Sequence, residues 1–430
     1  MIGRGKLSQI GKYPVMSKLG EGATSEVYLC HDPFKHRDVA IKVAFPETFQ
    51  DPERGKLYRK LFVTEASLAG KLQHPHICQI YDAVADEKLH YIVMEYVNGG
   101  TLEKFCRPEA LLDVEKIVEI IFKCTRALEF AHKLGVTHRD IKPANILHTA
   151  DTDVKISDFG AALIATGDTT QVTAVGSPAY MSPEQVKERG LDHRTDIYSI
   201  GVVMYHLLTG RLPFQGAKNF SLLYQITSVE AEPPSTFRPE IPAAVDAIVM
   251  RAMAKDLDQR YRRWEEFSFD LAEAFRAERL SAQKTQEFSD SDRFETLRKL
   301  PFFTQFSDAE LWEVARISSW RHAAAGEVLM KEGELGDFFC ILAEGQVKIT
   351  KRDRFLNVLH AGEPFGEMAY LSRENQRGAD VTVVEDANII SVPTAKLAQA
   401  SDGCRHKFAG AFMRILVERL TMANIRLSGA

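Results

Sequence analysis

Two short polar segments of this 430-residue chain carry residue types that suit one kind of chemistry. The first is residues 138–145, HRDIKPAN, and the second is Asp158-Phe159-Gly160, thirteen residues after Asn145. Together they supply two carboxylates, an amide and an ammonium group. One acid can orient a hydroxyl and accept its proton, an acid and an amide oxygen can hold a divalent cation against phosphate oxygens, and the lysine can balance phosphoryl charge. The two segments therefore predict phosphoryl transfer.

The string and its spacing resemble the catalytic loop and metal-binding motif of eukaryotic-type protein kinases. The resemblance implies that Asp140 positions the substrate hydroxyl or acts as the base and that Lys142 steadies the γ-phosphate of ATP. It also implies that Asn145 and Asp158 hold Mg²⁺. A lysine two residues after the aspartate resembles serine/threonine kinases rather than tyrosine kinases. The resemblance covers about residues 13–275, and the motifs look most like those of the bacterial Hanks-type branch.

A glycine turn precedes this machinery in the chain. Gly20 and Gly22 separate two predicted strands, and glycines let backbone amides approach phosphates without a Cβ in the way. The kinase pattern has a third glycine where this chain has Ser25. That departure would reshape the lid over the phosphates without abolishing binding.

The resemblance also assigns the rest of an ATP site. Lys42, at the end of a predicted short strand, would contact the α- and β-phosphates and pair with Glu65 on a predicted helix. Residues 91–100 are predicted as a buried strand that runs into a hinge, where the backbone would bind adenine. The expected ATP-binding residues are Gly20, Gly22, Val27, Ala40, Lys42, Met94, Glu95 and Val97.

Residues 161–182 form a hydroxyl-rich segment that resembles a kinase activation loop. Arg139, beside the expected catalytic aspartate, offers a cationic partner for a phosphate on this loop. The candidate phosphorylation sites, in order of preference, are Thr173, Thr170 and Thr169.

Several elements must position these residues. Residues 113–134 show apolar residues at helical spacing and lead to the catalytic loop. Residues 192–201 open a buried helix, in which Asp196 is expected by resemblance to bond backbone amides of the catalytic loop. Arg260 is likewise expected to pair with Glu184.

Composition limits the class of protein. The length suits two or three domains, and the formal net charge of −5 argues against a nucleic-acid binder. Six scattered cysteines without a CxxC pair argue against a disulfide framework or zinc site and fit a reducing cytosol. Residues 1–15 lack the apolar core of a signal peptide, and no run approaches the roughly 18 apolar residues of a membrane span. We therefore expect a cytoplasmic protein without a nucleic-acid partner or a membrane span.

The pattern changes in the last third of the chain. Residues 276–294 are polar and charged and are expected to form a linker or helical connector. A short helix at residues 308–317 precedes short strands separated by glycines, which is typical of an antiparallel roll or barrel. Residues 338–349, with Gly345 in the middle, are expected to form a hairpin.

A glutamate, an arginine ten residues later and a helix N-terminus can hold a ribose hydroxyl and a phosphate together. Glu367 and Arg377 have this spacing, which resembles the phosphate-binding cassette of cyclic-nucleotide-binding domains of the catabolite-activator and protein-kinase-A-regulatory type. The resemblance implies that Glu367 binds the ribose 2′-hydroxyl and Arg377 the cyclic phosphate. The expected nucleotide-binding residues are Gly366, Glu367, Met368, Ala369, Arg377 and Gly378.

Two positions depart from the usual cassette pattern. Gly378 lacks a hydroxyl, which favours cAMP over cGMP. Asp380 places a carboxylate near the expected phosphate, which is unfavourable unless the side chain points away, as strand alternation allows. A domain of this fold that no longer binds nucleotide remains an alternative.

Residues 403–427 are predicted as one amphipathic helix, with Arg414, Glu418 and Arg419 off its apolar stripe. By resemblance it would cover its own barrel, close over the base and also pair two copies of the chain as a homodimer. The predicted apolar stripe comprises Phe408, Phe412, Ile415, Leu416, Leu420 and Ala423.

The sequence thus predicts an α+β multidomain chain, a bilobal protein-kinase fold followed by a cyclic-nucleotide-binding, jelly-roll-like β-roll with flanking helices. The expected activity is transfer of the ATP γ-phosphate, with Mg²⁺, to serine or threonine hydroxyls of an unidentified protein substrate. Cyclic nucleotide and activation-loop phosphorylation would regulate it, with activation favoured. A constitutively active kinase whose barrel only dimerises or docks, and a catalytically dead scaffold, remain alternatives. The expected boundaries are an extension at 1–12, a kinase domain at 13–275, a linker at 276–294, a nucleotide-binding domain at 295–402 and a helix at 403–430.

Overall fold

The computed structural model describes residues 7–428 apart from residues 23, 51–54, 86–88, 150, 162, 165–177, 217, 282–287 and 369–375. The chain divides into two compact units, Met1–Ala282 and Gln283–Ala430. Each unit combines helices with a β-sheet and contains its own hydrophobic core. The predicted α+β multidomain class is therefore confirmed.

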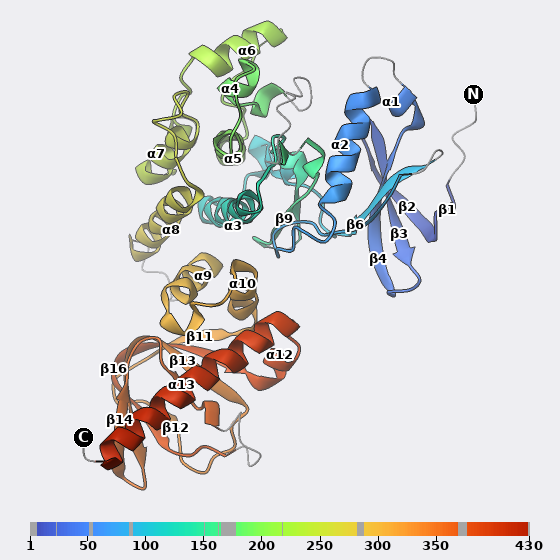
Figure 1. Ribbon diagram of the computed structural model, residues 1–430. Helices are drawn as coiled ribbons and strands as arrows, with labels where there is room; N and C mark the ends of the chain where they lie inside the picture. The colour runs from blue at the N-terminus through green and yellow to red at the C-terminus, as the bar shows by residue number, and fades with distance from the viewer. Residues whose placement is uncertain are drawn as a thin grey trace. The chain divides into compact units, whose positions relative to one another are not determined.

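A six-stranded antiparallel sheet begins the first unit, with the strand order β1-β2-β3-β4-β6-β5 (Figure 1). Alternate residues of its strands are buried, as in β3, where Tyr28 and Cys30 enter the core. The longer helix of this part, α2, carries the buried Glu65 near its C-terminal end. The elements are β1 (Gln9–Ile10), β2 (Tyr13–Glu21), β3 (Ser25–Asp32), β4 (Arg37–Ala44), α1 (Pro46–Gln50), α2 (Gly55–Ser67), β5 (Ile80–Ala85) and β6 (His90–Glu95).

Helices dominate the rest of the first unit, and α3 and α5 lie at its centre (Figure 1). Most residues of both helices are buried, and α3 packs on α5 and α8. Gly210 ends α5 with a φ of 68°, a left-handed conformation that glycine adopts without a Cβ clash. The helices are α3 (Val114–Lys133), α4 (Pro183–Val186), α5 (Arg194–Thr209), α6 (Asn219–Ser228), α7 (Ala243–Ala252) and α8 (Trp264–Ser281). The short strands are β7 (Val136–Thr137), β8 (Ile146–His148), β9 (Val154–Ile156) and β10 (Leu163–Ile164). The 3-10 helices are η1 (Leu102–Phe105), η2 (Pro108–Ala110), η3 (Pro143–Asn145), η4 (Phe159–Ala161), η5 (Pro178–Tyr180) and η6 (Pro234–Thr236).

The second unit is an antiparallel roll with flanking helices, as predicted. Its strands follow the order β11-β16-β13-β14, and β12 and β15 pair with β16 and β13. Residues 308–317 form the predicted helix, α10, which a capping box at Ser307 begins. The elements are α9 (Asp290–Lys299), η7 (Pro301–Phe303), α10 (Asp308–Ile317), β11 (Ser319–Ala323), β12 (Val328–Met330), β13 (Phe338–Lys351), β14 (Arg354–Leu359), β15 (Pro364–Phe365), β16 (Asp380–Pro393), α12 (Thr394–Ala398) and α13 (Asp402–Ser428).

Helices occupy both ends of the predicted linker at residues 276–294. Helix α8 continues to Ser281, and α9 begins at Asp290, where the Ser289 side chain caps it. Residues 282–287 lie outside the described part of the chain.

The hairpin predicted within residues 338–349 is wrong. Strand β13 runs unbroken through this stretch and pairs with β16, with register shifts around Gly345. Gly345 has a φ of 89°, and a Cβ there would lie 2.5 Å from the carbonyl oxygen of Asp386, so this glycine serves a β-bulge rather than a turn. The chain reverses later, between β13 and β14, where Arg352 and Asp353 have φ angles of 49° and 60°.

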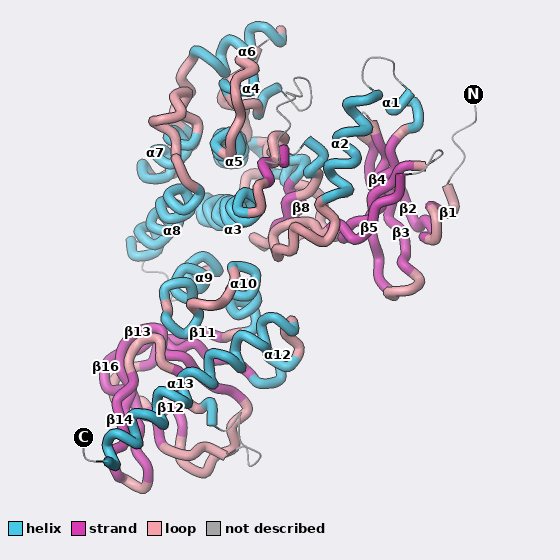
Figure 2. The backbone as a smooth tube through the Cα atoms, viewed as in Figure 1, coloured by secondary structure: helices cyan, strands magenta, loops and turns pink. Residues whose placement is uncertain are grey.

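The C-terminal stretch is one long helix, α13, as predicted, and it crosses the roll (Figure 2). Phe408 and Phe412 pack on Phe339 of β13. Leu420, predicted to belong to the covered stripe, is 62% exposed, whereas Arg419 contacts the roll. This part of the predicted stripe is therefore wrong: position 419 is seven residues after Phe412 and shares its face, while position 420 is turned about 100° further round the helix.

Candidate functional site

The residues predicted to act from the catalytic loop lie together in the structure. Lys142 Nζ is 2.8 Å from Asp140 Oδ2. Asn145, at the end of η3, donates from Nδ2 to the backbone carbonyl of Asp140 at 2.8 Å and to its Oδ2 at 3.2 Å. The Asp140 carboxylate is thus oriented by an ammonium and an amide group. Because the amide nitrogen of Asn145 is used in this way, its amide oxygen is the atom that a cation would meet.

Helix α5 supports the same loop through a buried carboxylate. Asp196 accepts hydrogen bonds from the backbone nitrogens of His138 at 2.7 Å and Arg139 at 2.8 Å, which confirms the predicted contact. Burial raises the pKa of Asp196, and the two loop amides and the neighbouring His138 oppose that rise. Arg139 has a φ of 71°, which is costly for a residue other than glycine, so the bond to its amide helps to hold an unfavourable backbone shape.

A lysine and two carboxylates form a compact array where β4, α2 and the Asp158 segment meet. Lys42 Nζ lies 3.0 Å from Glu65 Oε2 and 2.7 Å from Asp158 Oδ1, so the predicted Lys42–Glu65 pair is confirmed. Burial alone would lower the pKa of Lys42, but the carboxylates of Asp158 and Glu65 outweigh it and raise that pKa. Burial raises the pKa of Glu65, whereas the Lys42 ammonium outweighs burial at Asp158 and lowers its pKa to about 2. The lysine therefore remains charged between two acids.

The glycine turn closes without a third glycine. Gly20 of β2 pairs with Val27 of β3, and the ladder ends one residue later at the Glu21–Glu26 pair. The backbone nitrogen of Gly22 donates to the carbonyl of Ser25 at 2.8 Å. Ser25 is the first residue of β3, is buried and pairs with Ala44 of β4. Ser25, the position at which the sequence departs from the kinase pattern, is therefore an ordinary residue at the start of strand β3.

Four of the predicted ATP-site residues lie on neighbouring strands. Val27 of β3 is opposite Lys42 of β4, and Ala40 of β4 is opposite Met94 of β6. Lys42 was predicted to end its strand, but β4 continues two residues further because its pairing with β6 continues to Val43.

An ion pair joins the start of the hinge to strand β9. Glu95 ends β6, and its carboxylate lies 3.1 Å from Lys155 Nζ and accepts a bond from the backbone nitrogen of Gln79 at 3.3 Å. Lys155 also donates to the carbonyl of Pro75 at 2.7 Å. Val97, two residues beyond Glu95, is half-buried. The start of the predicted hinge, at Glu95, is therefore held by contacts with Lys155 and Gln79.

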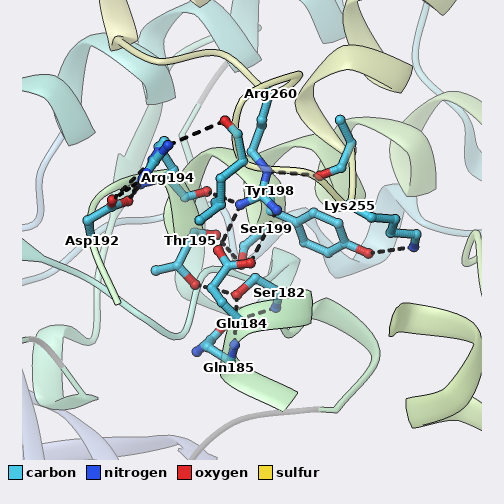
Figure 3. Close-up of polar contacts among 12 residues, drawn as sticks. Ser182, Glu184, Gln185, Asp192, Arg194, Thr195, Tyr198, Ser199, Lys255 and Arg260 are labelled. Carbon is cyan, nitrogen blue, oxygen red and sulfur yellow. Dashed lines mark hydrogen bonds and ion pairs between the residues drawn. The ribbon is translucent and has the colours of Figure 1, made fainter. Parts of the chain in front are cut away.

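A buried ion pair anchors the chain just after the predicted activation loop (Figure 3). The side chains of Glu184 and Arg260 are 6% and 0% exposed, and Arg260 Nη1 and Nη2 donate to the two carboxylate oxygens at 2.7 and 3.2 Å. Arg260 also donates to the carbonyls of Arg194 at 2.8 Å and Ala254 at 3.0 Å. The predicted partnership of Arg260 with Glu184 is confirmed, and it ties α4 to the start of α5.

In the second unit, a buried arginine lies beside a buried glutamate. Glu367 and Arg377 are 2% and 5% exposed. Arg377 Nη1 donates to the carbonyl of Gly366 at 2.9 Å, and the guanidinium lies 4.6 Å from the centre of the Phe338 ring. Its Nη2 is buried and meets no hydrogen-bond partner within the described part of the chain. A buried cation with a donor left over suits an anionic ligand such as a phosphate.

Helix α13 brings Arg419 to this site, a residue that the apolar pattern places away from the roll. Arg419 Nη1 is 2.6 Å from Glu367 Oε1, and Nη2 donates to the carbonyl of Pro364 at 2.7 Å. Burial raises the pKa of Glu367, and the positive charge of the Arg419 guanidinium opposes this rise. The spacing of seven residues from Phe412 is the sequence signal that could have placed Arg419 here; nothing in the sequence pointed to Phe338.

The other predicted cassette residues are less enclosed. Met368 and Gly378 are exposed. The Asp380 carboxylate accepts a bond from the backbone nitrogen of Glu332 at 2.7 Å, so it is engaged by a neighbouring turn. The predicted residues that lie outside the described part of the chain are Ala369, Thr169, Thr170 and Thr173.

Comparison with known families agrees with this arrangement. The protein kinase domain matches residues 13–271, more than half of the chain, and the chain belongs to the protein kinase family. The cyclic nucleotide-binding domain matches residues 320–402. The predicted combination of a kinase domain with a C-terminal cyclic-nucleotide-binding domain is therefore confirmed.

The chain is similar to several bacterial proteins named serine/threonine-protein kinases. It is 40% identical over 270 residues to a probable serine/threonine-protein kinase of Streptomyces coelicolor, covering 61% of this chain and 39% of that protein. It is 38% identical over 290 residues to the serine/threonine-protein kinase PknB of Mycobacterium tuberculosis, covering 66% and 45%. The chain spans less than half the length of these curated relatives. Among the helices that the structure describes, none combines the length and the apolar character needed to cross a membrane.

Proposed function

We propose that this chain is a protein serine/threonine kinase that transfers the γ-phosphate of ATP to serine or threonine hydroxyls. The observation that carries the proposal is the orientation of the Asp140 carboxylate by Lys142 and Asn145. In this role Asp140 would receive the substrate hydroxyl and accept its proton, and Lys142 would stabilise charge on the γ-phosphate.

The donor set fits ATP with a divalent cation. Asp158, whose pKa is lowered to about 2, and the amide oxygen of Asn145 are hard oxygen donors of the kind that Mg²⁺ prefers. When bound, Mg²⁺ would neutralise charge on the phosphates. Lys42 would contact the α- and β-phosphates and Glu65 would hold Lys42 in place. The proposed ATP-binding residues are Gly20, Gly22, Val27, Ala40, Lys42, Met94, Glu95 and Val97.

Replacement of Asp140 by asparagine tests this proposal. Wild-type chain, Asp140→Asn and the control Asp38→Asn would be incubated with labelled ATP, Mg²⁺ and myelin basic protein. Asp38 is a surface residue of β4 that pairs with His31. Loss of a general base costs roughly 10²–10⁴-fold in rate, so Asp140→Asn should be nearly inactive and Asp38→Asn should equal the wild type. Phosphorylation that is unchanged in Asp140→Asn would mean that the activity does not come from this site, and this result would favour the catalytically dead scaffold.

We also propose that a cyclic nucleotide binds to the second unit and raises kinase activity. The support is the buried Arg377 with its spare Nη2 next to the buried Glu367, which suit a cyclic phosphate and a ribose hydroxyl. The Asp380 carboxylate already accepts a hydrogen bond from a backbone amide. The missing hydroxyl at Gly378 favours cAMP over cGMP. The nucleotide would shift the kinase only as far as it prefers the active state.

Calorimetric titration of the full chain with cAMP and cGMP tests the second proposal. Loss of a charge-assisted phosphate contact in Arg377→Ala should cost roughly 1.5–3 kcal/mol, or about 10- to 150-fold in affinity. The control Arg321→Ala removes an exposed arginine of the same unit that pairs with Glu327, and its affinity should match the wild type. Absence of heat with either nucleotide, from a chain that still phosphorylates protein, would favour the constitutively active kinase with a docking or dimerisation module.

The remaining features of the proposal concern regulation and assembly. Autophosphorylation would fall on Thr173 or on Thr170 or Thr169, which mass spectrometry of the ATP-treated chain can locate. Pairing of two copies through α13 and a cytoplasmic location remain predictions. So do the boundaries of the kinase domain at 13–275, the linker at 276–294, the nucleotide-binding domain at 295–402 and the helix at 403–430.

A further inference from the structure

Strands β13 and β14 form a hairpin whose end is uncovered in the second unit. Residues 351–357 are all exposed. Strand β14 is the last strand of its sheet, so its outer edge pairs with no other strand in the described part of the chain (Figure 1). Arg352 and Asp353 form the turn with φ angles of 49° and 60°, and the Arg352 backbone nitrogen donates to the Glu332 carboxylate at 3.0 Å. The hairpin therefore ends in a defined turn that presents its side chains to the surroundings.

Two large apolar side chains are among these exposed residues. Phe355 is 65% exposed and Leu356 is 47% exposed. Phe355 pairs with Thr350, whereas the next pair along the ladder joins Ile349 to Asn357, so Leu356 is the extra residue of a β-bulge. In a regular strand one of two consecutive side chains would face the core. The bulge is the reason that both face outward.

Four basic side chains accompany this apolar pair, and all of them are exposed. They are Lys348, Lys351, Arg352 and Arg354. In the part of the chain that the structure describes, none of the four lies within ion-pair distance of a carboxylate, whereas Arg321 of the same unit pairs with Glu327. Asp353 in the turn and Glu332 beside it are acidic, so the basic residues remain in the majority. The chain as a whole has a net charge of −5, and this hairpin is a local exception.

We propose that the end of the β13–β14 hairpin binds the surface of anionic lipid bilayers. Phe355 and Leu356 enter the boundary between headgroups and acyl chains, and the basic residues bind the lipid phosphates. Basic residues alone would also protect the free edge of β14 from pairing with another strand, but edge protection gives no reason for two exposed apolar side chains. Leu356 is aliphatic and cannot stack on a base, which favours a bilayer over a single-stranded nucleic acid.

Sedimentation of the full chain with vesicles tests the inference. The vesicles contain either phosphatidylcholine alone or equal parts of phosphatidylcholine and phosphatidylglycerol. The chain should bind the anionic vesicles and not the neutral ones, and added salt should weaken binding because it screens the lipid charge. Arg352→Gln/Arg354→Gln removes two cations, each of which contributes roughly fivefold near an anionic surface, so the affinity should fall about 25-fold.

A matched control removes the same charge elsewhere in the second unit. Arg321→Gln/Arg405→Gln replaces two half-exposed arginines that pair with carboxylates. Its affinity should stay within about twofold of the wild type, because charges away from the contact surface are screened. The apolar contribution is tested by Phe355→Ser/Leu356→Ser, which should weaken binding about tenfold or more. Its control is Val384→Ser, which replaces an exposed valine of β16 and should bind as the wild type does.

A fluorescent label reports entry of the hairpin into the bilayer. All six cysteines of the chain are buried, so Leu356→Cys provides an exposed thiol to which a nitrobenzoxadiazole label can be attached selectively. Its emission should become stronger and move to shorter wavelength with anionic vesicles, because the label leaves water. A label attached to Val384→Cys should not change.

The possible contrary results are distinct. Equal binding to both kinds of vesicle, an unchanged affinity in Arg352→Gln/Arg354→Gln, or an unchanged label at position 356 would each overturn the inference. Without vesicle binding, oligothymidylate binding that Arg352→Gln/Arg354→Gln abolishes would instead assign the hairpin to nucleic acid. A dimer that Phe355→Ser/Leu356→Ser dissociates, again without vesicle binding, would assign it to a second copy of the chain. None of these measurements uses ATP, so failure of the proposed kinase activity would leave the inference standing.

Discussion

Arg260 offers a direct measurement of what the buried ion pair contributes to stability. In Arg260→Met, the Glu184 carboxylate stays buried without its cation, and the carbonyls of Arg194 and Ala254 lose a donor (Figure 3). Removal of one partner from a buried pair costs about 3–5 kcal/mol, because the charge left behind is uncompensated. We expect the free energy of unfolding of the first unit to fall by that amount.

The double variant tests the physical reason. Arg260→Met/Glu184→Leu removes both charges, and replacement of a buried pair by apolar residues is often close to neutral. The carbonyls of Arg194 and Ala254 lose the same donor in Arg260→Met and in the double variant, so their cost cancels when the two variants are compared. The double variant should therefore be more stable than Arg260→Met, because only the single variant leaves the Glu184 charge uncompensated.

The three tryptophans of the chain allow the first unit to be followed alone. Trp264 lies buried in the first unit, whereas Trp312 and Trp320 belong to the second. In a Trp312→Phe/Trp320→Phe background, tryptophan fluorescence during urea unfolding reports the first unit. The matched control is Arg251→Met, whose partly exposed pairs with Glu266 and Asp270 should contribute less than about 1 kcal/mol.

Two results would refute this reasoning. One is a loss below about 1 kcal/mol in Arg260→Met, which would mean that Glu184 is not left as an uncompensated buried charge. The other is a double variant whose loss equals the sum of the two single losses, which would mean that the two residues are not energetically coupled.

Three further predictions concern the two sites and the roll. Lys42→Met removes the cation between Glu65 and Asp158, and phosphorylation of myelin basic protein should fall at least about a hundredfold; an unaltered rate would contradict the role. Because burial raises the pKa of Glu367, its carboxylate protonates above the usual range, so cAMP affinity measured by calorimetry should fall on acidification from pH 7 towards pH 5, and Glu367→Gln should abolish that pH dependence. The same raised pKa means that this group favours folding of the second unit more at acidic than at neutral pH. Gly345→Val should lower the melting temperature of the second unit, since its φ is 89° and a Cβ meets backbone, whereas Gly410→Ala, with open space around it, should not.

Local chemistry explains why much of the kinase site could be predicted. The residues of the loop at 138–145 act through their types and their spacing along one short segment, and the fold preserves both. Glu65 could be placed on its helix for the same reason. The identity and order of these groups are properties of the chain itself.

The failed predictions share a different cause. Gly345 is compatible with a turn or with a bulge, and the pairing of β13 with β16, a strand forty residues later, decides between them. The apolar stripe of α13 shows which residues can be covered, but the roll decides that Arg419 is covered and Leu420 is exposed.

The sequence alone determined which chemical groups the protein has and the segments on which they lie. Only the tertiary structure decided which of them meet: Lys42 with Asp158, 116 residues apart, Glu367 with Arg419, 52 residues apart, and Tyr180 with His206. The physical reason is that such contacts depend on how buried faces of distant elements pack against one another. No pattern within a single segment records that packing.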